Sequence, residues 1–84
     1  MNMRSQGLFL MKRKPKIDLH AIGSRIRRLR GPMLQEELAV LLDVTQGHLS
    51  KIEAGKIAPS LEILVALSAR FDKTVDWIIR GDQK

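Results

Sequence analysis

Apolar residues in this chain recur at helical spacing in five segments, and glycine, proline or short polar residues separate those segments. In the first segment Ile22, Ile26 and Leu29 follow an i, i+4, i+7 pattern, which places them on one face of a helix. The same reasoning predicts helices over residues 18–30, 34–42, 45–54, 61–71 and 75–80. We therefore expect an all-α fold in which short helices share one core.

Local signals mark where these helices begin and end. Four helices start at a residue whose side-chain oxygen can accept a hydrogen bond from the first turn. These capping residues are Asp18, Thr45, Ser60 and Thr74. The second helix starts at Leu34, which has no such oxygen, and a missing cap of this kind costs about 1 kcal/mol. Gly31–Pro32, Gly55 and Gly81 are expected to end the helices that precede them.

The segment 35–54 is apolar only where two crossing helices must touch. The inward positions are Leu38, Ala39 and Leu42 on its first helix, Val44 in the turn, and Leu49 and Ile52 on its second helix. The small Ala39 allows a close approach, and Asp43 tolerates the left-handed backbone of a tight turn. This pattern predicts a helix-turn-helix, a unit whose second helix can enter the major groove of DNA.

The last two helices are expected to complete the core and to contact a second copy of the chain. The predicted core residues of the fourth helix are Leu61, Leu64, Val65, Leu67 and Ala69. The short segment 75–80 holds Val75, Trp77, Ile78 and Ile79, which is more apolar surface than a small monomer can bury. We expect these four residues to form a dimer interface; the alternative is that Trp77 completes the core.

The charge of the chain is unevenly distributed. The net charge is +6, made up of +8 over residues 1–30 and −2 over residues 31–84. We expect a flexible basic arm over residues 1–17, one domain over 18–81 and a tail over 82–84. The basic side favours an anionic partner, for which nucleic acid is the leading candidate. The arm could instead be a solvated tail without function, or its GLFLM segment could pack on a partner subunit.

Several classes of function are disfavoured by the composition. There is no cysteine, and His20 and His48 lie on different predicted helices, so no metal site or other cofactor is expected. Asp43, His48 and Ser50 lie too close together in the sequence to surround a substrate, so we expect no enzyme. No segment is long enough to span a membrane or to act as a signal peptide, which favours the cytoplasm.

The order and spacing of QEELAVLL, DV, TQGHLSKIE, AGK, APSLEIL and FDKTVDWIIRG resemble the XRE family, the Cro- and cI-repressor-like DNA-binding domains of phages and bacteria. The resemblance covers residues 22–81. It implies a compact five-helix, lambda-repressor-like domain that binds double-stranded operator DNA, commonly as a homodimer. The chain departs from the family pattern at Leu34, Asp43 and Gly47, and in a shorter link between its first two helices.

On the third predicted helix, the face opposite Leu49 and Ile52 is expected to read bases. Its residues are Gln46, Gly47, Ser50 and Lys51. Gln46 can bond both edge atoms of adenine, and Lys51 can donate to guanine or to a phosphate. Gly47 has no side chain to bond a base; it either lets the backbone approach the bases or is a tolerated small residue.

The resemblance also implies contacts to the DNA backbone and one structural ion pair. The expected backbone contacts are Gln35, Thr45, His48 and Lys56, although His48 could equally be an ordinary half-exposed histidine. Glu53 would be unfavourable beside DNA unless paired, and the resemblance implies Arg30 as its partner, with Arg27 as the alternative.

Taken together, these features predict a sequence-specific transcriptional regulator, a repressor that binds a pseudo-palindromic operator as a homodimer. The alternative is an antitoxin or a restriction–modification controller, whose main partner is another protein such as a toxin.

Overall fold

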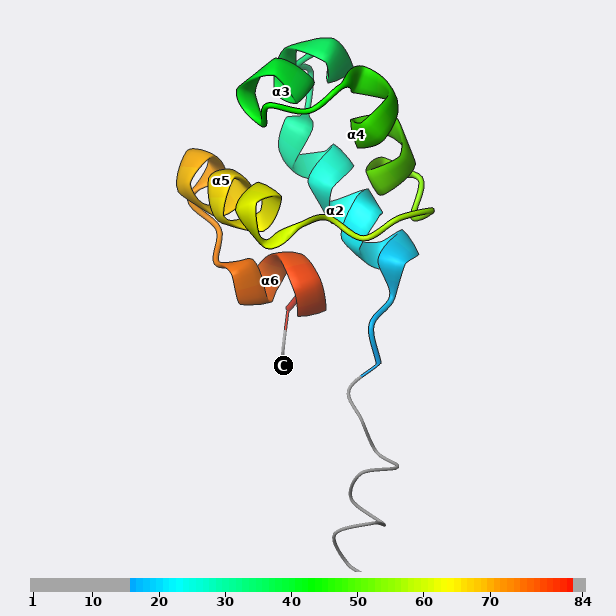
Figure 1. Cartoon of the computed structure of the whole chain (residues 1–84). Coiled ribbons are helices and arrows are strands. Elements are labelled where there is room, and N and C mark those ends of the chain that lie inside the picture. Colours follow the sequence, from blue (N-terminus) through cyan, green and yellow to red (C-terminus); the bar gives the residue numbers. More distant parts are fainter. Residues whose placement is uncertain (1–15, 83–84) are drawn as a thin grey trace, which may run out of the picture.

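The computed structural model describes residues 16–82, and these form five helices without a strand. With the labels of Figure 1, the helices are α2 (Leu19–Arg30), α3 (Gln35–Leu41), α4 (Gln46–Glu53), α5 (Leu61–Phe71) and α6 (Val75–Arg80). In Figure 1, α3 and α4 lie together at the top of the domain, with α4 alongside α2, and α6 lies below α5. The predicted all-α fold is confirmed. The proposed arm falls on residues 1–15 for the most part, which lie outside the described residues.

The predicted helix starts are set by side-chain caps. Asp18 accepts a hydrogen bond from the Ala21 N–H at 3.1 Å, and Thr45 accepts one from the His48 N–H at 3.0 Å. Ser60 and Thr74 cap α5 and α6 in the same way. Leu34 provides no side-chain cap, but its own N–H donates to Glu37 Oε1 at 2.9 Å. This is one of the two hydrogen bonds that make up a capping box, and it fixes the start of α3.

The turn between α3 and α4 has the predicted left-handed residue. Asp43 has a φ of 59°, and the turn is closed by the Val44 N–H donating to the Ala39 carbonyl at 3.0 Å. A second left-handed aspartate, Asp72 with a φ of 56°, ends α5 and was not predicted. Short polar side chains tolerate this region better than most, so both turns form without glycine.

The core is entirely apolar and draws on every helix. Its fully buried large side chains are Ile26, Leu38, Leu49, Ile52, Leu67 and Ile78. Ala39 is also buried, as the helix-turn-helix pattern predicts. A further small residue, Gly23, lets α2 approach α4, because a Cβ there would lie 2.5 Å from the Ile52 and Glu53 carbonyl oxygens. The two helices therefore cross at backbone contact distance.

Predictions for α5 and α6 are partly wrong. Leu61 and Val65 are 76% and 61% exposed and Ala69 is also exposed, because α5 turns only the face of Ile63, Leu64 and Leu67 toward the core. Ile78, expected at a dimer interface, is fully buried within the monomer. The Ile78 side chain packs in the same apolar core as the buried side chains of α2, so no second copy of the chain is needed to cover it.

The last helix is attached to α2 by an arginine that the sequence analysis did not single out. Arg25 Nη1 donates to the Ile78 and Ile79 carbonyl oxygens at 2.8 and 3.0 Å. These carbonyls end a helix and have no partner within it, and a cation also suits the negative end of the helix dipole. Gly81 packs against the same guanidinium, where a Cβ would lie 2.6 Å from Arg25 Nη2.

Replacing Arg25 by methionine should destabilise the domain by about 2 kcal/mol, because two hydrogen bonds from a charged donor are lost while the aliphatic stem is kept. Urea unfolding followed by the fluorescence of Trp77, the single tryptophan, measures the change. Arg28→Met is the control, since Arg28 is exposed and its side chain makes no hydrogen bond or ion pair within residues 16–82. Equal stability of the two variants would contradict the role given to Arg25.

Candidate nucleic-acid interface

Helix α4 is held with its polar face toward solvent. Leu49 and Ile52, 0% and 1% exposed, bury its inner side, and α4 packs on both α2 and α3. The predicted base-reading residues Gln46, Gly47, Ser50 and Lys51 are all exposed. The structure therefore brings all four onto one open surface, which we call the reading face.

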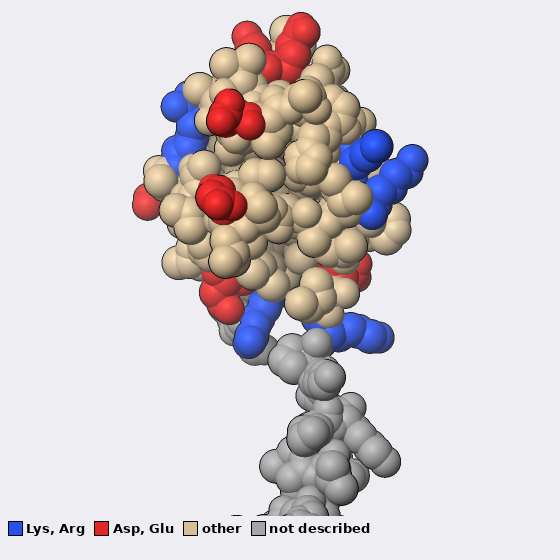
Figure 2. Space-filling model, in the orientation of Figure 1, with Lys and Arg blue, Asp and Glu red and all other residues tan. Residues whose placement is uncertain are grey.

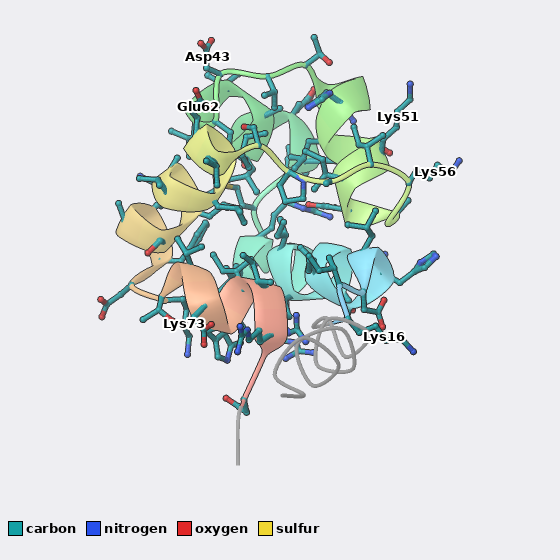
Figure 3. The ribbon with its side chains drawn as sticks, turned by 60° about the horizontal axis from the view of Figure 1, so that its bottom comes forward. Lys16, Asp43, Lys51, Lys56, Glu62 and Lys73 are labelled. Atoms are coloured by element: carbon teal, nitrogen blue, oxygen red, sulfur yellow. The ribbon has the colours of Figure 1, made fainter. Side chains whose placement is uncertain are left out.

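The predicted backbone-contact residues surround this reading face. Lys56 is the third residue after the end of α4, and its N–H donates to the Lys51 carbonyl at 2.9 Å, which keeps the two residues close together. Both side chains point away from the domain on the same side in Figure 3. In Figure 2 basic side chains project at the right of the domain, and acidic side chains are visible at its top, left and lower edge. Thr45 and His48 are exposed at the start of α4.

An ion pair joins the end of α2 to the end of α4. Arg30 Nε and Nη2 donate to the two Glu53 carboxylate oxygens at 2.8 and 2.9 Å, and Arg30 Nη1 donates to the Met33 carbonyl. The side chains are only 15% and 5% exposed. The hydrogen bond to Glu53 raises the pKa of Arg30 above its ordinary value, against the opposing effect of desolvation. Arg30 is therefore the partner of Glu53, and the carboxylate is neutralised before any DNA arrives.

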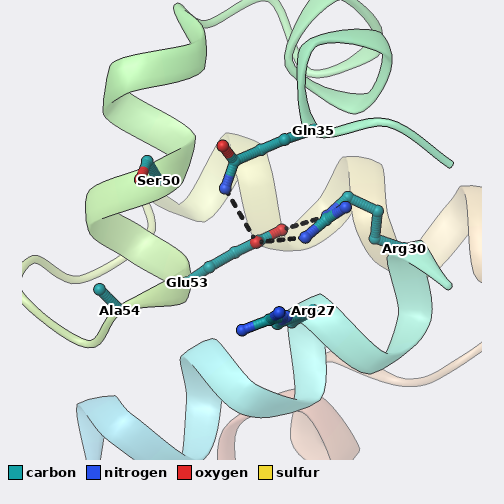
Figure 4. A pocket seen from close by; sticks show the side chains of 6 residues that line it. All are labelled: Arg27, Arg30, Gln35, Ser50, Glu53 and Ala54. Atoms are coloured by element: carbon teal, nitrogen blue, oxygen red, sulfur yellow. Dashed lines mark hydrogen bonds and ion pairs between the residues drawn. The ribbon is translucent and has the colours of Figure 1, made fainter. Parts of the chain in front are cut away.

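Gln35 extends this pair toward the reading face. Its Nε2 donates to Glu53 Oε1 at 3.0 Å, and its Oε1 accepts from Gln46 Nε2 at 3.3 Å. Arg30, Glu53, Gln35 and Gln46 thus form one continuous network, whose inner part Figure 4 shows. The sequence analysis missed the link between the two glutamines. They are eleven positions apart, and only the crossing of α3 and α4 makes them neighbours.

A polar cleft of about 340 Å³ opens beside the network. Its lining residues are Arg27, Arg30, Gln35, Ser50, Glu53 and Ala54 (Figure 4). Arg27 is exposed on its wall, and its side chain makes no hydrogen bond or ion pair within the part of the chain that the structure describes. Because Arg30 already neutralises Glu53, Arg27 leaves the cleft with an uncompensated positive charge. A DNA phosphate is the type of group that such a charge attracts.

Residues 16–82 lack the features of two other classes of site. This part of the chain has no cluster of three histidine, cysteine or acidic side chains arranged to hold a metal ion. None of its helices is both long and apolar enough to cross a lipid bilayer.

The fold and the exposed polar helix together define a DNA-binding domain of the helix-turn-helix class. A family model described as helix-turn-helix matches residues 25–78, more than half of the chain. The crystal structure of the P22 c2 repressor in complex with synthetic operator 9T in the presence of Tl⁺ is similar, with 30% identity and a TM-score of 0.67. The match covers 73% of this chain and 96% of that one. No curated protein sequence matches.

The chain therefore belongs to the XRE family of Cro- and cI-repressor-like helix-turn-helix proteins. It is a DNA-binding transcriptional regulator.

We expect Glu53→Gln to destabilise the domain by about 2 kcal/mol, because Arg30 then stays enclosed without its counter-charge. Urea unfolding at neutral pH measures the loss. Because the pKa of Arg30 is raised, titration of Arg30 would remove the contribution of the pair only at strongly alkaline pH. Glu36→Gln, at an exposed position of α3, should change stability by less than about 0.5 kcal/mol. A similar small effect at Glu53 would mean that the pair is not stabilising.

Proposed function

We propose that this protein is a repressor that binds a pseudo-palindromic operator as a homodimer, with α4 of each copy in the major groove. The observation that carries the proposal is the reading face, polar and fully open on a helix whose other side is anchored in the core. The fold shared with the P22 c2 repressor, which was crystallised with a synthetic operator, supports it. In a dimer the two α4 helices would lie about 34 Å apart, one turn of DNA.

We assign the proposed base contacts to individual side chains according to their positions on α4. Gln46 would bond an adenine edge, and Lys51 a guanine edge, with Ser50 between them. The hydrogen bond from Gln46 to Gln35 holds the Gln46 amide in place before DNA binds, which lowers the entropic cost of the contact.

Contacts to phosphates would fix the position and orientation of the domain on the DNA. The Gln35 amide gives one N–H to Glu53 and has a second for a phosphate. Thr45 accepts a hydrogen bond from His48 N–H and can still donate its hydroxyl proton. Lys56, His48 and Arg27 would add contacts around the reading face. Such contacts position the protein without selecting a sequence.

The direct test is selection of bound duplexes from a random pool, followed by titration of the selected duplex at several salt concentrations. We expect a symmetric motif and an affinity that falls steeply with salt, because lysine and arginine contacts release counterions. No binding to any duplex at low salt would refute the proposal.

In the same titrations, Lys51→Ala and Lys56→Ala form a matched pair, because each removes one positive charge from an exposed position. Lys56→Ala should reduce the slope of log affinity against log salt by about 1, because one phosphate contact is lost. Lys56→Ala should weaken all duplexes by the same factor, whereas Lys51→Ala should also change the preferred base at one position. A uniform loss for Lys51→Ala would make Lys51 a backbone contact.

The proposed dimer would use α6. Val75, Trp77 and Ile79 are half-buried beside the core, so each keeps apolar surface for a second copy after Ile78 is fully covered. Lys73 Nζ lies 4.8 Å from the centre of the Trp77 ring, and Trp77 Nε1 donates to Asp82, so the ring orientation is held from two sides.

Val75→Asp should shift the protein from dimer to monomer in sedimentation velocity, because the interface would have to bury an unpaired carboxylate. The first position of a helix favours an acidic residue, but Val75 also packs partly against the core, so circular dichroism must first show that the variant is folded. Val65→Asp is the control, because Val65 is 61% exposed on α5 and should not affect association. Dissociation by the control alone would move the interface to α5.

A second candidate function is favoured by large apolar side chains exposed away from α4. Val40 on α3 and Leu61 and Val65 on α5 are all more than 60% exposed. An antitoxin or a restriction–modification controller would need a surface of this kind for its protein partner. Stoichiometric copurification of another protein from the native host would favour this function over a stand-alone repressor.

A further inference from the structure

We infer that each operator half-site contains one base pair that this protein leaves unread, opposite Gly47. This inference rests on the proposed function and deepens it by assigning a gap to the recognition pattern. Its starting point is the position of Gly47 on α4 rather than the identity of any base.

Gly47 occupies the central position of the reading face. Leu49 and Ile52 define the direction in which α4 faces the core. At 100° per residue, Gly47 points within about 10° of the opposite direction, straight out of the domain. Ser50 and Lys51 lie about 50° to either side of it. The position aimed most directly into a groove is thus the one without a side chain.

The fold itself does not require glycine at this position. A Cβ built on Gly47 meets no atom within 4 Å, and its backbone is helical. Gly23 and Gly55 differ, because a Cβ there would lie 2.5 Å from carbonyl oxygens and 2.8 Å from His20, respectively. Glycine is also an unfavourable residue in a helix. The glycine is therefore explained by the surface that α4 presents to a partner and not by packing within the domain.

The chemistry of base recognition explains why a base pair opposite Gly47 would be unread. Base pairs are distinguished by donors, acceptors and the thymine methyl group at the groove edge. A glycine has no side chain that could donate or accept a hydrogen bond. The space it leaves accommodates an A·T, T·A, G·C or C·G pair equally well. Gln46, one residue before Gly47, and Ser50 and Lys51, about one turn after it, would read the neighbouring pairs.

The test is selection from a random duplex pool with the wild-type protein, Gly47→Ala and Gly47→Gln. The wild-type motif should contain, in each half-site, one base pair without preference between preferred pairs. Gly47→Ala should keep this motif and raise Tm by about 4 °C, because the Cβ has open space and alanine favours helix. Gly47→Gln should create a preference of about tenfold at the formerly neutral pair and leave the other pairs unchanged.

His48→Gln is the matched control, because it adds the same side chain about 100° around the helix. Because His48 is proposed to contact the DNA backbone, this substitution can change the affinity for all duplexes by one common factor, but it should create no new base preference. The inference is overturned if the wild-type motif has no neutral pair, or if Gly47→Gln leaves the motif unchanged. It is equally overturned if folded Gly47→Ala loses binding to every duplex, since the backbone would then have to approach the bases closely. Failure of the wild-type protein to enrich any motif would instead refute the proposed DNA-binding function.

Discussion

The arrangement of the site depends on the ion pair between Arg30 and Glu53. Helix α4 has only eight residues and buries only two large side chains, so apolar packing alone defines its rotation weakly. The pair fixes its far end to α2 through two hydrogen bonds of 2.8 and 2.9 Å. Because both side chains are largely enclosed, the interaction is screened less by solvent than a surface ion pair would be. Gln35 then transmits this fixed geometry to Gln46.

A small core constrains the rest of the molecule. Each helix can turn only one narrow face inward, and no polar residue among residues 16–82 is buried. Gly23 and Ala39 matter as much as the large side chains, because they set how closely α2, α3 and α4 approach. Because α5 can turn only one face inward, Leu61 and Val65 stay exposed to solvent although their side chains are as apolar as those in the core.

Much of this architecture was predictable because its signals are local. A cap such as Thr45 and a turn residue such as Asp43 act on their own neighbours, so they can be recognised without a structure. Periodicity finds the apolar side of a helix but not how much of it a partner helix covers, which is why Val65 and Ile78 were misplaced. The contacts of Arg25 with α6 and of Gln35 with Gln46 depend on helix crossings, and no local pattern encodes them.

The contact of Arg25 with the end of α6 has a consequence during protein synthesis. Ile78 belongs to the same core as Ile22 and Ile26, and the two carbonyls bound by Arg25 belong to residues 78 and 79. A nascent chain that has emerged from the ribosome only as far as α5 lacks both the side chain and the hydrogen-bond acceptors that α2 needs. Helix α4 is therefore translated before the side chain and the two carbonyl groups that complete the core supporting it.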